Sequence, residues 1–271
     1  MAKNQGLRPD LASLAGVLLA LGGILGGLLL EGGKISDIAQ YTAALIVLGG
    51  TTGATMLNSP LPTFCSAFRR LATVFLEKQQ PVEDGIDQII QFATKARRAG
   101  IVSLEADVEN IQDPFLKKAL ALAVDGADLQ EIRSMMELEI QQLELRAESE
   151  AKVFEQAGGY APTIGIIGAV LGLIQVMKNL ANIDEVGHGI AVAFVATVYG
   201  VGVANLFFLP AAGKIKARAA EEVRFKEMML EGVAAIVEGL NPKLIRNKLE
   251  AYAPKSVPRG QRRKGAARHA A

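Results

Sequence analysis

The sequence predicts an all-α integral membrane protein with four transmembrane helices and a helical cytoplasmic domain between the second and the third. Half of the 271 residues are hydrophobic, yet 21% are charged, so apolar and charged residues must occupy separate stretches. Four stretches of 18 residues or more carry no Asp, Glu, Lys or Arg, and the segments between and after them show helical periodicity. A single cysteine excludes a disulfide scaffold.

The first two predicted spans lie close together near the N-terminus. Leu11 to Leu30 has no charge and has the length of about 20 residues that a helix needs to cross a bilayer. A signal peptide is the alternative, but the stretch offers only a weak cleavage site. Tyr41 to Asn58 is shorter, richer in Thr and Gly, and ambiguous when taken alone.

The third and fourth predicted spans form a second pair. They run from Gly158 to Met177 and from Gly189 to Pro210, and both contain glycines that would let neighbouring helices approach closely. A buried helical hairpin in a soluble protein is the alternative. Four such stretches in one chain favour the membrane.

The positions of Lys and Arg predict the orientation of the spans. Basic residues are frequent before the first span, after the second and after the fourth, whereas the two short connections contain mainly acidic residues. Since cytoplasmic flanks carry an excess of Lys and Arg, we expect both termini to be cytoplasmic.

Five segments follow from these spans. They are residues 1–58 with spans one and two, 59–157 as the cytoplasmic helical domain, 158–211 with spans three and four, 212–253 as a charged cytoplasmic helix, and 254–271 as a basic disordered tail. The tail could lie on anionic lipid, and a nucleic-acid arm is the weaker alternative.

Within the cytoplasmic domain, periodicity predicts individual helices. Asp84 to Arg98 places isoleucines on one face, and Pro114 after Asp113 can begin a helix. In the long run from Asp128 to Glu155, we expect an apolar stripe to pack on one side; its members are Leu138, Leu143 and Leu145. We expect Cys65 to be a small buried apolar side chain.

No motif for catalysis, metal ligation or cofactor binding is present, so the sequence predicts a protein that is not an enzyme. The four spans also lack the carboxylate that ion transport through a bilayer normally uses. Their polar residues are neutral; they include Thr51, Thr52, Thr55, Thr163, Gln175, Thr197, Tyr199 and Asn205. If this chain conducts ions, another chain must supply the carboxylate.

Two prolines lie near the cytoplasmic ends of spans three and four. Pro162 and Pro210 could be paired hinges, because proline inside a helix removes a hydrogen bond. Alternatively, Pro162 begins one helix and Pro210 ends another.

Three motifs in order resemble the MotA family of flagellar motor stator subunits. They are APTIGIIGAVLGLI from Ala161, AVAFVATVYGVGVANLFFLP from Ala191, and the cytoplasmic stretch KARRAGIVSLEADVE from Lys95. Four spans with a large loop after the second agree with that family. The resemblance covers Leu11 to about Tyr252 and excludes the basic tail.

The resemblance implies roles for particular residues. Arg97 or Arg98, together with Glu105, would engage the rotor protein FliG. Pro162 and Pro210 would couple ion passage to movement, and Thr197 would face the ion path. Sodium-driven relatives tend to carry a threonine where this chain has Ala169, which favours protons.

The resemblance also implies partners. A MotB-type single-span protein would supply the membrane aspartate, inside a homo-oligomeric, pentameric ring in the bacterial inner membrane. The lipid bilayer would surround the ring, and no nucleic acid is expected. The related ExbB and TolQ energisers are the alternative, but their large cytoplasmic segment follows the first span. A structural scaffold without ion flow is the third hypothesis.

Overall fold

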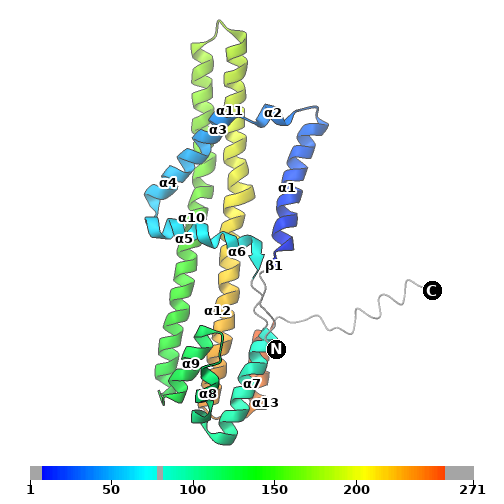
Figure 1. Cartoon of the computed structure of the whole chain (residues 1–271). Coiled ribbons are helices and arrows are strands. Elements are labelled where there is room, and N and C mark those ends of the chain that lie inside the picture. The colour runs from blue at the N-terminus through cyan, green and yellow to red at the C-terminus, as the bar shows by residue number, and fades with distance from the viewer. Residues whose placement is uncertain (1–7, 78–81, 254–271) are drawn as a thin grey trace, which may run out of the picture. The chain divides into compact units, whose positions relative to one another are not determined.

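The computed structural model describes residues 8–77 and 82–253, so the predicted basic tail lies outside the described residues. The described chain divides into two compact units (Figure 1). Unit 1 comprises residues 8–77 and 144–219, and unit 2 comprises residues 82–143 and 220–253. The five segments predicted from sequence describe where the chain would enter and leave a bilayer, whereas these two units describe which residues pack together. The predicted segment boundaries therefore stay predictions.

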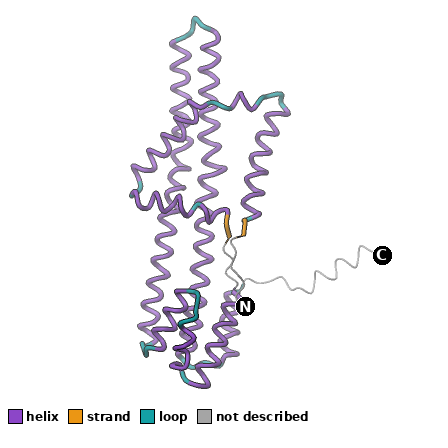
Figure 2. Tube along the Cα trace, viewed as in Figure 1, coloured by secondary structure: helices purple, strands orange, loops and turns teal. Residues whose placement is uncertain are grey.

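Unit 1 is built from helices (Figure 2). Its elements are β1 (Arg8–Pro9), α1 (Leu11–Leu30), α2 (Ile35–Ile38), α3 (Tyr41–Ala44), the π-helix η1 (Leu45–Gly49), α4 (Gly50–Asn58), α5 (Leu61–Arg70), α6 (Ala72–Phe75), β2 (Leu76–Glu77), α11 (Ile183–Val203) and the π-helix η3 (Ala204–Phe208). The strands β1 and β2 form one short antiparallel pair. Two long helices, α10 (Leu129–Lys178) and α12 (Leu209–Val237), contribute residues to both units.

Three helical segments among the described residues are long and apolar enough to cross a membrane. They are Leu11–Leu30, Leu129–Lys178 and Ile183–Val237, and they contain the predicted first, third and fourth spans. The first segment is α1, where the Asp10 side chain accepts hydrogen bonds from the backbone N–H groups of Ala12 and Ser13 and so caps the helix. No residue of α1 is buried, and Figure 1 shows this helix standing apart from α10 and α11.

The predicted second span is helical over its whole length, through α3, η1 and α4. It ends at Asn58, before Pro60, as expected of a helix that meets a proline. One stripe of this segment is buried at intervals of four residues; its members are Ala43, Val47, Thr51 and Thr55. Ala43 and Val47 pack against Val195 and Ala196 of α11.

Unit 2 has a core of large side chains. Its further elements are α7 (Val82–Ala99), η2 (Ile101–Leu104), α8 (Glu105–Val108), α9 (Pro114–Val124), α13 (Pro242–Leu249) and η4 (Glu250–Tyr252). As predicted, α9 begins at Pro114, with Asp113 as its N-cap. The fully buried side chains include Ile89, Leu104, Phe115, Leu116, Leu120, Ile132, Met136, Met228, Met229 and Ile245.

The stripe predicted for the long helix was wrong. Leu138 is 56% exposed and Leu145 is 48% exposed, whereas Ile132, Met136 and Ile140 face the core. Both sets have helical spacing, so periodicity alone could not select the side that meets α9 and α12. The core side carries β-branched and thioether side chains, which fill the space between crossing helices.

The burial predicted for Cys65 was also wrong, because this side chain is exposed. It lies on α5, an amphipathic helix that buries Ala67. Residues two apart on a helix point in nearly opposite directions, so burial of Ala67 turns Cys65 outward.

Candidate functional site

The helices α10 and α11 pack with their backbones in contact. A Cβ atom added at Gly200 would lie 2.5 Å from the carbonyl oxygen of Ala161, and one added at Gly172 would lie 2.7 Å from that of Gly189. At Gly165 the corresponding distance to the Ala196 carbonyl oxygen is 2.9 Å. Only glycine fits these positions, and such close approach is typical of helix pairs in membranes.

Thr197 lies at this interface, on α11. Its Cα atom is 3.5 Å from the position of a Cβ added at Gly165, and its side chain is partly buried. The Thr197 hydroxyl donates to the Ala193 carbonyl at 3.2 Å, within its own helix. The oxygen therefore keeps a lone pair for a second partner. Ala169, one turn of α10 beyond Gly165, is also partly buried and offers no such atom.

Neither candidate proline is at a true helix end. Pro162 is inside α10, and Pro210 is the second residue of α12, in a helical run that continues from α11 through η3 into α12. The alternative in which Pro162 begins a helix and Pro210 ends one is therefore wrong. A Cβ added at Gly158, one turn before Pro162, would lie 2.6 Å from the Leu209 side chain. The two prolines thus lie on neighbouring helices, offset by about one turn.

The backbone adapts to Pro210 by widening into a π-helix. The Leu209 N–H group bonds to the Ala204 carbonyl, five residues back instead of four. Proline has no N–H group and its ring clashes with the carbonyl four residues earlier, which explains a wide turn here. The Asn205 side chain donates to the Val201 carbonyl at 2.9 Å, so it satisfies a backbone oxygen next to this turn. We did not predict this feature from sequence.

Tyr199 connects α11 to the link between α2 and α3. Its hydroxyl donates to the Ile38 carbonyl and accepts from the Gln40 backbone N–H at 3.3 Å. The sequence marked Tyr199 only as a neutral polar residue of the fourth span. Its partners are about 160 positions away, so no local pattern could have indicated them.

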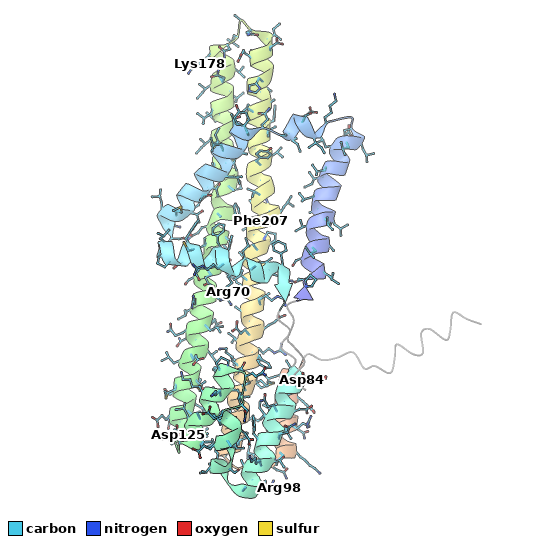
Figure 3. The ribbon with its side chains drawn as sticks, in the orientation of Figure 1. Arg70, Asp84, Arg98, Asp125, Lys178 and Phe207 are labelled. Carbon is cyan, nitrogen blue, oxygen red and sulfur yellow. The ribbon has the colours of Figure 1, made fainter. Side chains whose placement is uncertain are left out.

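Two carboxylates in unit 1 are buried, and no pattern in the sequence indicated their burial. Glu150 on α10 is 3% exposed and accepts from the Ser66 hydroxyl and from Arg70 Nη1 at 3.0 Å, both on α5. Figure 3 labels Arg70 at this junction. Arg146 Nε lies 3.4 Å from the same carboxylate. Because a buried charge needs partners, this cluster fixes α5 to α10.

Asp10 is the second buried carboxylate. It binds Lys214 Nζ at 2.5 Å and Arg218 Nη2 at 2.8 Å, both on α12. The hydrogen bond from Lys214 is the largest effect and lowers the pKa of Asp10 far below its ordinary value. Burial opposes this change, while the Ser13 N–H and the charge of Arg218 support it. Asp10 therefore joins the start of α1 to α12 as a permanent anion.

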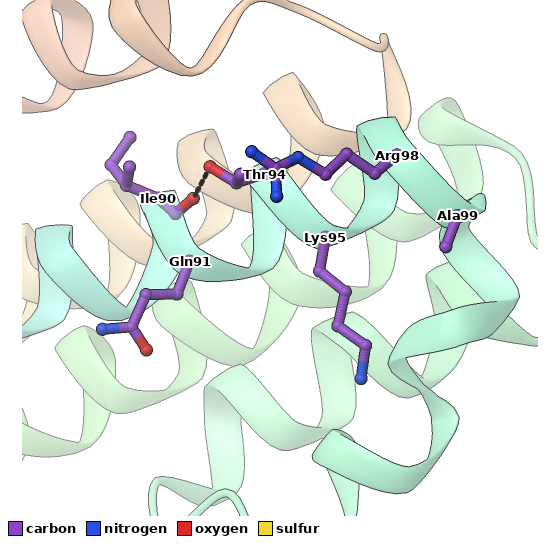
Figure 4. A pocket seen from close by; sticks show the side chains of 6 residues that line it. All are labelled: Ile90, Gln91, Thr94, Lys95, Arg98 and Ala99. Carbon is purple, nitrogen blue, oxygen red and sulfur yellow. Dashed lines mark hydrogen bonds between the residues drawn. The ribbon is translucent and has the colours of Figure 1, made fainter.

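The candidate rotor residues belong to unit 2. Arg97 and Arg98 end α7, and Glu105 begins α8 after a turn in which Gly100 has φ 82°. All three charged side chains are exposed, and within the described parts of the chain none of them has an ion-pair partner. Only Arg98 lines a hollow on the surface of α7 (Figure 4).

Two family models match the chain. The model described as the MotA/TolQ/ExbB proton channel family covers residues 107–228, and the model described as Motility protein A N-terminal covers residues 14–100. Together with the apolar helix pair, these matches indicate the class: a membrane subunit of the proton channel type.

Full-length relatives narrow the class to one family. Motility protein A of Bacillus subtilis (strain 168) is 39% identical over 246 residues, which are 90% of this chain and 91% of that protein. Chemotaxis protein PomA of Vibrio alginolyticus is 31% identical over 90% of this chain and 95% of its own length. The chain belongs to the motility protein A (MotA) family.

Solved structures agree with this assignment. The structure of C. jejuni MotAB matches with a TM-score of 0.88 and 34% identity, covering 92% of this chain and 98% of that one. The flagellar MotAB stator complex from Bacillus subtilis matches with a TM-score of 0.82 and 39% identity, covering 90% and 96%. The fold of this chain is thus that of a stator subunit.

Proposed function

We propose that this chain is the MotA-type subunit of a flagellar motor stator, which forms an ion channel with a MotB-type protein and converts ion flow into torque. The observation that carries the proposal is the match to two solved MotAB structures over at least 90% of the chain. The match of the N-terminal model over residues 14–100 favours this function over an ExbB-like or TolQ-like energiser. Nothing in this function requires enzymatic chemistry.

The membrane arrangement follows from the apolar helices. We propose four spans in the bacterial inner membrane, with both termini and the large segment after the second span in the cytoplasm. The helical segment of residues 41–58 would be the second span, and its buried stripe against α11 supports this role. Lys214, Lys216 and Arg218 follow the fourth span, where a cytoplasmic flank should be basic.

The ion-binding group would come from the partner. No Asp or Glu lies within the four predicted spans, so a single-span MotB-type protein would supply an aspartate inside a ring of these chains. A pentamer is the ring we propose. Protonation of that aspartate would change its hydrogen bonding and shift the balance between conformations of the ring.

Protons are the proposed ion. The Thr197 hydroxyl is the one side-chain oxygen that we assign to the path, and Ala169 adds none. A sodium ion would need several oxygen ligands, whereas a proton needs only the partner's carboxylate. Pro162, Pro210 and the π-helix η3 would then transmit movement from the ion path into α12.

Torque would pass to the rotor protein FliG through exposed charges. Arg97, Arg98 and Glu105 are exposed without ion-pair partners among the described residues, which leaves them available to a partner. Exposed charges add little to stability but steer association. Reversing Arg98 or Glu105 should weaken torque, and an opposite reversal on FliG should restore part of it.

Thr197→Val tests the ion path in cells that lack their own stator genes. Valine keeps the shape and removes only the hydroxyl, so the complex should still assemble while swimming speed falls several-fold. Thr52→Val, on an exposed threonine of α4, is the matched control. Normal swimming by the Thr197 variant would favour a scaffold without ion flow. Separately, if cells with the unaltered chain stopped swimming when external sodium was removed, the choice of protons would be refuted.

A further inference from the structure

Two neighbours contact α11, and both do so mainly through small or apolar residues. On one side α10 approaches closely, with Gly165 and Gly172 against the backbone of α11. On another side α3 and η1 pack against it through Ala43 and Val47 (Figure 1). Small residues let helices approach closely, but they present no long side chain that resists rotation of one helix against the other. The apolar contacts of α11 therefore leave its rotation to be fixed by another side chain.

Tyr199 makes the side-chain hydrogen bonds that join α11 to a different element. Its hydroxyl donates to the Ile38 carbonyl and accepts from the Gln40 backbone N–H at 3.3 Å, in the link between α2 and α3. Within the described parts of the chain, no other side chain of α11 forms a hydrogen bond outside its own helix, since the Thr197 hydroxyl bonds to the Ala193 carbonyl. A tyrosine side chain has only two torsions, so bonds at its far end restrain the helix that carries it.

Thr197 and Tyr199 leave α11 on nearly opposite sides. They are two residues apart, which is about 200° around the helix axis. Tyr199 packs against the cluster that contains Ala43 and Val47, whereas Thr197 lies at the contact with Gly165 of α10. Because both side chains belong to one helix, a rotation of α11 that moves the Tyr199 hydroxyl moves the Thr197 hydroxyl by the same angle.

We propose that Tyr199 is a positioning residue for the ion path. Its two hydrogen bonds to the link between α2 and α3 fix the rotation of α11 and so hold the Thr197 hydroxyl in the direction of the path. The inference rests on the proposed function and specifies how the oxygen assigned to the path is kept in place. Tyr199 itself touches neither the ion nor the partner's carboxylate and acts only through Thr197.

Tyr199→Phe removes this restraint without leaving a backbone group unpaired. The Gln40 N–H also donates to the Ile38 carbonyl at 3.1 Å across the turn, so the two groups still satisfy each other when the hydroxyl is absent. Phenylalanine keeps the ring and its packing beside Ala43 and Val47. We therefore expect the variant to fold and to assemble, with α11 free to rotate.

The test is a double-mutant cycle in the full chain, expressed with its MotB-type partner in cells that lack their own stator genes. The rotation speed of a bead on a tethered flagellum is measured, together with the amount of partner that co-purifies. Tyr199→Phe should lower the speed several-fold with the complex intact. Added to Thr197→Val, it should cause no further decrease, because the oxygen that it positions is already absent. Added to Thr52→Val, it should lower the speed by the same factor as it does alone.

Tyr41→Phe is the matched control, because it removes a hydroxyl from the neighbouring α3 at a side chain that is 85% exposed, and it should leave the speed unchanged. Three results would overturn the role of Tyr199: normal speed in Tyr199→Phe, loss of the co-purified partner, or an equal further decrease in the Thr197→Val background. The last two would indicate a structural role that does not act through Thr197. All three would leave rotation by the unaltered chain intact, whereas failure of the unaltered chain to drive any rotation would refute the proposed function itself.

Discussion

The two units hold their helices together by opposite means. In unit 1, α10 and α11 meet through glycine and alanine, with Gly165, Gly172 and Gly200 against the facing backbone. In unit 2 the helices pack against one another through large buried side chains such as Phe115 and Met136. Between helices in lipid there is no hydrophobic driving force, so close backbone approach must supply the attraction; in water, burial of large apolar side chains supplies it.

The two units also differ in where their charged side chains lie and in what these side chains bind. Unit 1 buries Asp10 and Glu150 among basic partners, which connect separate helices. In unit 2, Glu231 lies between Arg133 and Lys248; burial raises its pKa, but the hydrogen bonds from these two cations outweigh that effect and lower it. Unit 2 leaves the charges at the end of α7 exposed. Fixed charge holds helices in place, and exposed charge is available to a partner.

The largest expected effect is at the contact of α10 and α11. Gly200→Val would drive a side chain into the Ala161 carbonyl, and backbone cannot move aside as a side chain can. We expect loss of the assembled complex, measured by size-exclusion chromatography in detergent. Gly202→Val is the control, because nothing lies within 4 Å of a Cβ at that position. Equal losses in the two variants would mean that valine acts through helix propensity and not through the contact.

Unit 2 should instead be destabilised when a side chain of its core loses volume. Phe115 is 1% exposed, and Phe115→Ala should lower the local free energy of unfolding by about 3–5 kcal/mol. Hydrogen exchange of the full chain should then be faster in α7 and α9 and unchanged in α11. Val102→Ala, at a side chain that is 63% exposed, should change neither. Faster exchange in α11 would contradict separate cores for the two units.

A smaller effect is expected where α5 joins α10. Glu150→Gln keeps the size of the side chain but removes its charge, so Arg70 loses its ionic partner. We expect a loss of about 1–3 kcal/mol in thermal unfolding of the purified complex. Glu148→Gln, at an exposed position one half-turn away, should have almost no effect. If both variants melted alike, the Glu150 cluster would contribute nothing to the attachment of α5.

The sequence indicated those features that depend on neighbouring residues. The uncharged run from Leu11 to Leu30 is a helix with those bounds, and Asp113 with Pro114 marks the start of α9. The side of α10 that faces the core could not be chosen, because Leu138 and Met136 both belong to stripes with helical spacing. Packing against other helices decided between them.

Contacts between residues far apart in the sequence could not be predicted from any local pattern. Arg70 and Glu150 are 80 positions apart, and Asp10 and Arg218 are 208 apart. The π-helix before Pro210 had a weak signal, since a proline within an apolar run requires backbone adjustment. The candidate residues Thr197 and Arg98 came from the family resemblance, and the hollow beside Arg98 came only from the structure.

The smallest expected effect is electrostatic and depends on pH. Asp10→Asn keeps a good helix cap for α1 but removes the charge that binds Lys214 and Arg218. Both cations can reach water, so we expect a loss of about 1 kcal/mol or less at neutral pH. Because folding lowers the pKa of Asp10, its carboxylate stabilises the fold above the ordinary pKa of 3.8, and this contribution is lost progressively as the pH falls from that value through the much lower pKa of the folded protein. The difference between thermal melts of the two proteins should therefore be constant from pH 7 to about pH 5 and be smaller, without vanishing, at about pH 3; a difference that stayed constant down to that pH would show that the cap, and not the charge, is what Asp10 provides.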